Sequence, residues 1–310
     1  MDPEGILLRL PEGVEPWEAL LFRVGLPLGK LRKALVELQN QGFPILWGED
    51  GAGLEPGAPA PQVLQPKLKG HLGWPYRYFG TVTSTQDVLR AWPEAPEGAV
   101  VAAERQTHGR GRFRRSWESP PGNLYFSVLL RANADPLLPL RAGLALVEAA
   151  QEGGLKWPND LLSPDGRKLG GILVEKDGSR VVLGVGINVK VAPVPGAAAL
   201  WEFRRVPRAD LLADFLWHLE RWLSAEKERV LSAWRERNVT LGREVAAMAG
   251  NKIVEGRAWD LGPNGELLLR TAKGMVILHA GEVSLRSWPD HVKEARGAEP
   301  QGPRSDKPGT

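Results

Sequence analysis

The sequence predicts an α+β protein built from three parts: an N-terminal winged helix-turn-helix, a central domain of strands and helices, and a C-terminal β-barrel of SH3-like size. Leucines at helical spacing mark a buried stripe across residues 28–38. Strand-like apolar runs alternate with helical stretches from residue 76 to residue 238, and four short strand-like runs follow up to residue 279. The expected boundaries are 1–64, 65–238 and 239–287, with a disordered tail at 288–310.

The composition is that of an ordinary soluble globular protein. With 310 residues, 43% hydrophobic and 25% charged, the chain is long enough for two or three domains with buried cores. It contains no cysteine, which excludes disulfides, thiolate metal sites and a cysteine nucleophile. The acidic start and the lack of a long apolar run argue against a signal peptide and a membrane span, so the cytoplasm is the expected location. A net charge of +3 is too small to indicate nucleic-acid binding by itself.

Residues 1–64 have the element order of a winged helix-turn-helix. A short helix is expected from Pro16 to Phe22, and Gly25–Pro27 makes the turn to a second helix. A strand over Phe43–Trp47 and a turn over Glu49–Gly53 would form the wing. Four leucines define the buried stripe of the second helix: Leu28, Leu31, Leu35 and Leu38.

The charge of this first part argues against DNA binding. It carries nine acidic and five basic side chains, a net charge of −4, and its wing holds Glu49 and Asp50 where a DNA-binding wing would carry Lys or Arg. Lys30, Arg32 and Lys33 do cluster at the second helix, so a DNA-binding role stays open beside a structural or regulatory one. The prolines of residues 55–67 predict a semi-rigid linker to the next domain.

The central domain is expected to contain five strands and several helices. The last two strands form a hairpin, because Asp177 and Gly178 lie at the turn between them. Residues 191–200 show no regular period and are expected to form a mobile loop. The predicted strands are 76–79, 99–103, 123–130, 168–175 and 180–188, and the predicted helices are 84–92, 141–152 and a helical region over 208–238.

The stretch Gln106–Trp117 is the strongest candidate site. From Arg105 to Arg115 the chain has five arginines and no acid, with two glycines between them. Arginine forks suit carboxylate and phosphate, glycines let backbone N–H groups approach a ligand, and Trp117 offers a flat face for a base. An anionic ligand of nucleotide type is therefore expected here. A solvated basic loop or a nucleic-acid patch is the alternative.

Four segments then occur in one order: Ser84–Gln86, Gln106–Trp117, Lys156–Asp160, and Lys168–Glu175 followed by Gly186–Asn188. This combination closely resembles the biotin protein ligases, the biotin–[acetyl-CoA-carboxylase] ligases. The resemblance covers about residues 70–286, and the N-terminal part resembles the winged helix of the family's bifunctional, DNA-binding members. It implies a central mixed-sheet α+β catalytic domain of the biotin/lipoate ligase type, followed by an SH3-like β-barrel.

The resemblance implies an ATP-dependent reaction in two steps. The carboxylate of biotin attacks the α-phosphate of ATP, giving biotinyl-5′-AMP and pyrophosphate. A lysine of the biotin carboxyl carrier protein, an acetyl-CoA carboxylase subunit, then attacks the mixed anhydride. Positive charge is what this chemistry needs, because two anions must meet and no protein nucleophile is required. The alternatives are a lipoate–protein ligase and a biotin-responsive DNA-binding repressor.

The resemblance also bears on metal and assembly. Mg²⁺ is expected to enter largely on the phosphates of ATP, and no residue is predicted to bind a metal directly. A homodimer formed through the catalytic sheet is implied, with the strand Arg180–Ile187 as an edge. No membrane partner is expected.

Position by position, the resemblance assigns residues to biotin. Ser84, Thr85 and Gln106 match the hydrogen-bonding partners of the ureido ring, whereas Gln86 stands where the family more often has asparagine. The glycine and arginine loop is expected to close over biotin and the phosphate, and Lys156 to bridge the carboxylate and the α-phosphate. The predicted biotin-binding residues are Ser84, Thr85, Gln86, Gln106, Gly109, Arg110, Gly111, Arg112, Lys156, Gly170 and Gly171.

A second set is assigned to ATP and the adenylate. Trp117 matches a tryptophan near the adenine, and the loop 191–200 is expected to order over the adenylate. Asp160 is left out, because it could equally be a cap or turn residue, and His108 is expected to be a solvated loop residue rather than a general base. The predicted catalytic residues are Lys156, Arg110 and Arg112, and the predicted ATP contacts are Arg110, Arg112, Trp117, Lys156, Asn159, Lys168, Ile172, Asn188 and Trp201.

Overall fold

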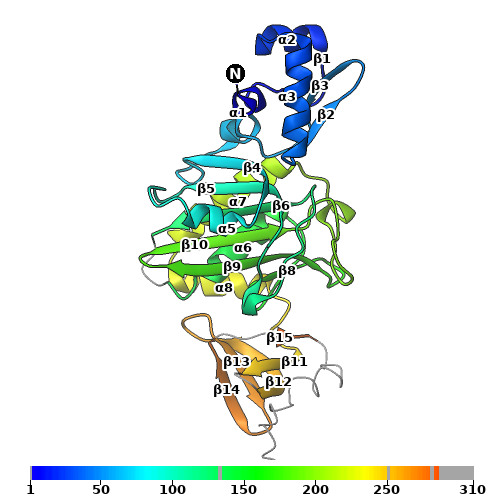
Figure 1. Cartoon of the computed structure of the whole chain (residues 1–310). Helices are drawn as coiled ribbons and strands as arrows, with labels where there is room; N and C mark the ends of the chain where they lie inside the picture. The colour runs from blue at the N-terminus through cyan, green and yellow to red at the C-terminus, as the bar shows by residue number, and fades with distance from the viewer. Residues whose placement is uncertain (1, 132–134, 250–251, 280–282, 286–310) are drawn as a thin grey trace, which may run out of the picture. The chain divides into compact units, whose positions relative to one another are not determined.

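The computed structural model describes residues 2–131, 135–249, 252–279 and 283–285. The chain divides into two compact units, Met1–Val239 and Thr240–Thr310. Within the larger unit a small helical part precedes a central β-sheet that carries helices on both faces (Figure 1). The smaller unit is made of β-strands. The protein is therefore α+β, as the sequence predicts.

The N-terminal part combines three helices with a small antiparallel sheet in the order β1-β3-β2. Leu31, Leu35 and Leu38 are fully buried on α3, which confirms three of the four leucines of the predicted stripe, whereas Leu28 is only partly buried. The predicted turn at Glu49–Gly53 is shorter than expected, because the chain from Gly51 onward forms the central strand of this sheet. The elements are α1 (Pro3–Leu7), β1 (Glu15–Pro16), α2 (Trp17–Val24), α3 (Leu28–Asn40), β2 (Ile45–Trp47) and β3 (Gly51–Leu54).

Residues 55–67 do not form the linker that their prolines predict. They contain helix α4 (Pro61–Leu64) and the 3-10 helix η1 (Gln65–Lys67). Ala58, Ala60 and Leu64 are fully buried. The apolar residues between the prolines bury their side chains within the larger unit, where α4 contacts α7 (Arg208–Leu223) and β4 (Tyr76–Val82). This burial outweighs the tendency of a proline-rich stretch to stay extended in water.

Seven strands of the described chain form the central sheet, in the order β4-β5-β6-β10-β9-β8-β7. β4 and β5 are parallel and the other neighbours are antiparallel, so the sheet is mixed. The prediction that Arg180–Ile187 is an edge strand is wrong, because this strand lies between β6 and β9 and pairs with both. The strands are β4 (Tyr76–Val82), β5 (Val100–Gln106), β6 (Leu124–Leu130), β7 (Gly154–Lys156), β8 (Asp160–Leu162), β9 (Lys168–Asp177) and β10 (Arg180–Ile187).

The two faces of this sheet have different covers (Figure 1). On one face lies α6 (Leu138–Ala150), with α7 (Arg208–Leu223) and α8 (Lys227–Arg237) beside it, and on the other lies the short helix α5 (Thr85–Arg90). Neighbouring residues of β6 show the alternation: the Phe126 ring lies 5.0 Å from the Phe215 ring of α7, whereas the Ser127 hydroxyl lies 2.7 Å from the Thr85 hydroxyl of α5. No helix in the described part of the chain is long and apolar enough to cross a membrane.

A buried ion pair joins Arg208 of α7 to Glu104 of β5. Arg208 donates to the carboxylate of Glu104 at 2.6 Å, and each side chain is 1% exposed. The phenol of Tyr78 donates to the second oxygen of the same carboxylate. Burial raises the pKa of Tyr78 well above its ordinary value, so its hydroxyl stays a donor.

The negative charge of the Glu104 carboxylate, which accepts from Tyr78, predicts that two tyrosine substitutions differ in their effect on stability. Tyr78→Phe is expected to lower the free energy of unfolding by about 2 kcal/mol, because a buried charged acceptor loses a partner. Tyr76→Phe is the matched control: its hydroxyl donates to the neutral carbonyl of Pro59, and a loss of about 1 kcal/mol is expected. Urea titration measures both. Equal losses would contradict a role for the charge of Glu104.

The smaller unit is an antiparallel sheet in the order β14-β13-β12-β11-β15. Its first four strands confirm the four strand runs predicted over residues 244–279, and the short β15 was not predicted. The predicted tail at 288–310 lies outside the described residues. The strands are β11 (Glu244–Ala249), β12 (Lys252–Leu261), β13 (Leu267–Thr271), β14 (Gly274–Leu278) and β15 (Val283–Ser284).

Candidate active site

A small cluster of polar side chains, the polar wall, forms where α5 meets the end of β5. Ser84 caps α5 by accepting the N–H of Gln86 at 3.3 Å. The side-chain oxygen of Gln106 accepts from the backbone N–H and the hydroxyl of Thr85, at 2.9 and 3.3 Å. The structure thus brings together three predicted residues whose donors and acceptors suit a polar, uncharged group.

Two further hydroxyls complete this wall and were not predicted. Ser127 lies 2.7 Å from the hydroxyl of Thr85, and Ser119 accepts from the amide nitrogen of Gln106 at 3.1 Å. Ser127 interrupts an otherwise apolar strand, and this break in the pattern was the available signal. Ser119 follows the basic loop without a pattern that marks it.

The basic loop folds back on itself at Gly109. Its carbonyl accepts the N–H of Trp117 at 2.9 Å, and a Cβ at this position would lie 2.4 Å from the Trp117 carbonyl oxygen. The tight approach therefore requires glycine. At the tip, Phe113 and Arg114 take left-handed φ values of 55° and 58°, which strains residues with side chains. His108 is exposed on the loop, as expected.

Glycines of β9 and β10 leave a floor on the α5 face of the sheet. Gly171 pairs with Gly186, and a Cβ on either would meet the Trp117 indole, at 3.4 and 2.6 Å. Gly170, which was expected on the same side, faces α6 instead, since its Cβ would lie 3.5 Å from a methyl of Leu146. Alternation places Ile172 on the α6 side as well, although its N–H donates to the carbonyl of Asn159. Gly186 belongs to a predicted motif, but its contact with Trp117 was not predicted.

Gln86 is buried on this floor rather than exposed at the helix start. Its amide nitrogen lies 3.5 Å from the carbonyl oxygens of Leu173 and Val182. A Cβ on Gly184 would come within 2.8 Å of the Gln86 side chain. The glycine at 184 thus makes the room that Gln86 occupies.

Three cationic side chains gather around the turn between β7 and β8. Arg112 donates to the Asn159 side-chain oxygen at 3.2 Å, and Asn159 in turn donates to the carbonyl of Ile172 at 2.7 Å. The Asp160 carboxylate lies 3.8 Å from the Lys156 Nζ and 2.7 Å from the Lys168 Nζ. Groups from three separate parts of the chain therefore meet here. Asp160, which was left out of the predicted site, lies between the two lysines.

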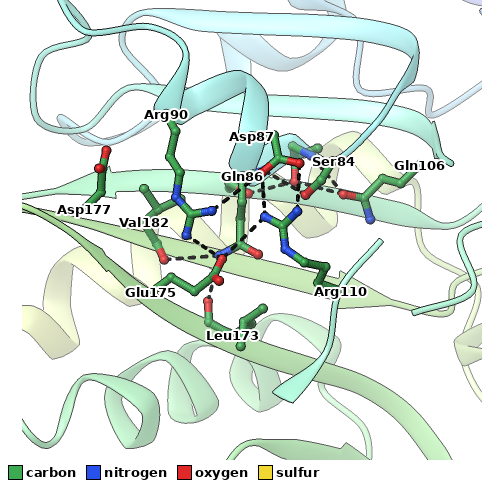
Figure 2. Close-up of polar contacts among 12 residues, drawn as sticks. Ser84, Gln86, Asp87, Arg90, Gln106, Arg110, Leu173, Glu175, Asp177 and Val182 are labelled. Carbon is green, nitrogen blue, oxygen red and sulfur yellow. Dashed lines mark hydrogen bonds and ion pairs between the residues drawn. The ribbon is translucent and has the colours of Figure 1, made fainter. Parts of the chain in front are cut away.

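Arg110 belongs to a different ion-pair cluster, as Figure 2 shows. Its two terminal nitrogens donate to the two carboxylate oxygens of Asp87, both at 2.7 Å, and one lies 3.7 Å from Glu175. The Arg110 guanidinium lowers the pKa of Asp87 from its ordinary value, so this carboxylate is ionised at neutral pH. The two predicted catalytic arginines, Arg110 and Arg112, thus contact different groups.

A cavity of about 280 Å³ opens beside Trp117, Lys168 and Asn188, and residues 193–197 form another of its walls. The Lys168 Nζ lies 5.1 Å from the centre of the Trp117 ring. Two buried atoms of the residues that line this cavity have no hydrogen-bond partner among the described residues, the Trp117 Nε1 and the Asn188 Oδ1. A donor and an acceptor beside a cavity are what a planar, hydrogen-bonding ligand would satisfy.

Trp201 is another predicted residue that lies away from this cavity. Its indole N–H donates to the carbonyl of Val206 at 3.0 Å, and its ring lies between Lys190 and Arg205, at 4.7 and 4.6 Å. Trp201 is not among the residues that line the cavity in the described part of the chain.

Comparison with known proteins agrees with these features. Residues 78–191 match the biotin/lipoate A/B protein ligase family, and residues 240–286 match the biotin protein ligase C-terminal domain. The biotin–[acetyl-CoA-carboxylase] ligase of Mycobacterium tuberculosis is 35% identical over 60% of this chain and 79% of its own length. The bifunctional ligase/repressor BirA of Escherichia coli is 32% identical over 66% of this chain and 72% of its own length.

Solved structures give the same relationship. The biotin protein ligase from Aquifex aeolicus in complex with biotin and ATP superposes with a TM-score of 0.61 and 31% identity, over 67% of this chain and 97% of that one. The relatives and the matching fold thus indicate the same family as the motifs of the sequence. The chain belongs to the biotin protein ligase family.

Proposed function

We propose that the protein activates biotin with ATP to biotinyl-5′-AMP and transfers the biotinyl group to a lysine of a biotin carboxyl carrier protein. The observation that carries this proposal is the convergence of Arg112, Lys156 and Lys168 around the β7–β8 turn. In the first step a carboxylate oxygen of biotin attacks the α-phosphorus and pyrophosphate leaves. In the second step the lysine amine of the carrier attacks the acyl carbon and AMP leaves.

The polar wall at α5 suits the ureido end of biotin. Ser84 and Thr85 are almost fully buried, and Gln106 is partly buried beside them. A buried urea with an unmet donor or acceptor would cost about 1–3 kcal/mol for each group, so such a wall must supply partners. Ser127 extends the wall with a hydroxyl from the sheet.

The cationic cluster suits the reacting ends of the two substrates. Lys156 and Lys168 share Asp160, which fixes both ammonium groups on one side of the turn. Arg112 contributes a fork that matches a carboxylate or phosphate. Because the transition state carries several negative oxygens, preorganised positive groups lower its free energy more than water can.

The cavity beside Trp117 suits the adenine. Asn188→Ala is expected to raise the KM for ATP about tenfold and to leave the KM for biotin within about twofold, because about 1.4 kcal/mol of ATP binding corresponds to a tenfold change. Steady-state pyrophosphate release measures both constants. Asn40→Ala, which removes an exposed amide at the end of α3, is the control and should match the wild type. Equal rises in the two KM values would contradict an adenine contact.

Mg²⁺ is proposed to be held mainly by the phosphates of ATP. An oxygen ligand of the kind that Mg²⁺ prefers lies beside the lysines, in the carboxylate of Asp160. No group of three His, Cys, Asp or Glu side chains in the described residues could hold a metal. When bound, the ion would neutralise phosphate charge, while Arg112, Lys156 and Lys168 orient the anions.

Biotin must be distinguished from lipoate, since the matching family model includes both ligase types. The test supplies labelled biotin or labelled lipoate with ATP to purified carrier domains of both kinds. We expect label only from biotin and only on the biotin carrier. Labelling by lipoate alone would overturn the proposal, because the dithiolane ring of lipoate has no N–H or C=O group that could pair with the polar wall at α5.

The N-terminal part is proposed to be a winged helix-turn-helix, and the smaller unit an SH3-like barrel. The order of α2, α3 and the β2–β3 hairpin supports the first assignment, and the five-stranded antiparallel sheet supports the second. The relative BirA is named a ligase/repressor, but the net charge of −4 over residues 1–64 disfavours DNA binding here. A gel shift with DNA upstream of biotin-synthesis genes, with and without biotinyl-AMP, tests this second role.

Three further assignments stay predictions: the homodimer, the cytoplasmic location and the domain boundaries. A homodimer through the catalytic sheet would need a strand other than β10, since β4 and β7 form the sheet edges. Analytical ultracentrifugation with and without biotin and ATP tests it. A cytoplasmic location and domain boundaries at 1–64, 65–238 and 239–287 are proposed from the sequence.

A further inference from the structure

The carboxylate of Asp87 is engaged by Arg110 through both of its oxygens. The two N–O distances are 2.7 Å, and the side chains are 29% and 39% exposed, so water screens the pair only in part. Glu175 extends the pair: one of its oxygens lies 3.7 Å from Arg110 and 2.7 Å from Arg90. Two carboxylates and two guanidiniums thus join the basic loop, α5 and β9 (Figure 2).

The first turn of α5 holds the basic loop at two points. Thr85 bonds to Gln106, where the loop begins, and Asp87 bonds to Arg110, near its tip. Between these points the backbone N–H of His108 donates to the carbonyl of Thr83 at 2.8 Å. Beyond Arg110 the backbone bond of Gly111 is to Arg115, within the loop itself. The tip therefore depends on side chains for its attachment to the rest of the fold.

Arg110 and Arg112, two of the arginines of the loop, contact different groups. Arg110 lies against two carboxylates, whereas Arg112 contacts the neutral amide of Asn159 beside the lysine cluster. A phosphate could use the fork of Arg110 only by displacing Asp87 from the same donors. Arg110 therefore attaches the loop to α5 and β9, whereas Arg112 is placed to bind the anion.

We propose that Asp87 is a positioning residue, which clasps Arg110 and so keeps the basic loop closed over the adenylate while Arg112 meets the anion. The proposal rests on the proposed function and deepens it. Asp87 touches no substrate in this scheme. It acts through Arg110, and its removal should loosen the loop and speed the escape of biotinyl-AMP more than it slows the formation of this intermediate.

The test uses the full chain with labelled biotin. Biotinyl-AMP is formed on the protein, excess unlabelled biotin and ATP are added, and the release rate is measured. Asp87→Asn is expected to release the adenylate about tenfold faster, which corresponds to the loss of one partly exposed charge pair. Asp87→Glu, which keeps the carboxylate, should stay within about threefold of the wild type. Arg110→Met should act like Asp87→Asn, and the double variant should be no faster, because both changes remove one contact.

Asp177→Asn is the matched control. It removes a nearby carboxylate at the end of β9, which pairs with Arg180 and not with the loop, and it should release the adenylate at the wild-type rate. Wild-type release by Asp87→Asn, or release rates that multiply in the double variant, would overturn the proposal. If the wild type forms no adenylate at all, the proposed function fails instead, so the two failures are distinct.

Discussion

Replacing Lys156 by alanine is expected to lower biotin-dependent exchange of pyrophosphate into ATP about a thousandfold, on the scale seen when a preorganised charge-stabilising group is removed from an active site. Lys156 is the last residue of β7 and pairs in register with Asp160 at the start of β8. The strand pairing fixes its backbone, so the ammonium group is positioned before the substrates arrive. Its loss leaves the approach of two anions without this charge.

The control for this variant is Lys176→Ala. Lys176 is an exposed lysine of β9, so the change removes the same charge from the same sheet. Exchange by this variant should stay within about twofold of the wild type, as is usual for surface substitutions. Circular dichroism should show an intact fold in both variants. Undiminished exchange in Lys156→Ala would reject its assigned role.

Replacing Arg112 by alanine is expected to speed the release of biotinyl-AMP about a hundredfold, because a fork held beside the phosphate contributes on the order of 2–3 kcal/mol. Arg112 is positioned by Asn159, whose own amide is held by the carbonyl of Ile172. The same release assay with labelled biotin measures the effect. Weakened retention should appear together with weaker biotin binding, since the loop covers both.

Arg114→Ala provides the matched comparison for this prediction. Arg114 is exposed two residues further along the same loop and carries the same charge. Its replacement should leave release within about threefold of the wild type, which surface screening allows. Equal effects of the two substitutions would mean that the loop acts only through its net charge, and the specific role of Arg112 would then be wrong.

Regular local patterns predicted much of the fold. The leucine stripe of α3 and the hairpin of β9 and β10 depend on spacing and turn residues that act within a few positions. β7 and β8 were missed because each has three residues and they flank a proline, so neither shows a period. The interior position of β10 in the sheet was also missed, because the sequence of an apolar strand that is buried on both faces does not indicate which strands pair with it.

The sequence predicted many residues of the candidate site but not which of them contact each other. Arg110 and Arg112 are two residues apart, and only the folded loop determines that one meets Asp87 and the other Asn159. Asp87 carries no local signal for its contact, since Arg110 lies 23 residues further along the chain. The partners of Asp160 are close in sequence, but its position fitted a cap or turn residue equally well. Long-range partners depend on the strand order, which the motifs alone do not contain.

The proposed function depends on the positive groups of Arg112, Lys156 and Lys168, which bring the carboxylate of biotin to the α-phosphate of ATP. The most direct test incubates the purified chain with labelled biotin and with ATP labelled at either the α- or the γ-phosphate, followed by rapid gel filtration. The account predicts that biotin and the α-label elute with the protein in equal molar amounts and that the γ-label does not. Retention of the γ-label, or biotin without the α-label, would contradict it.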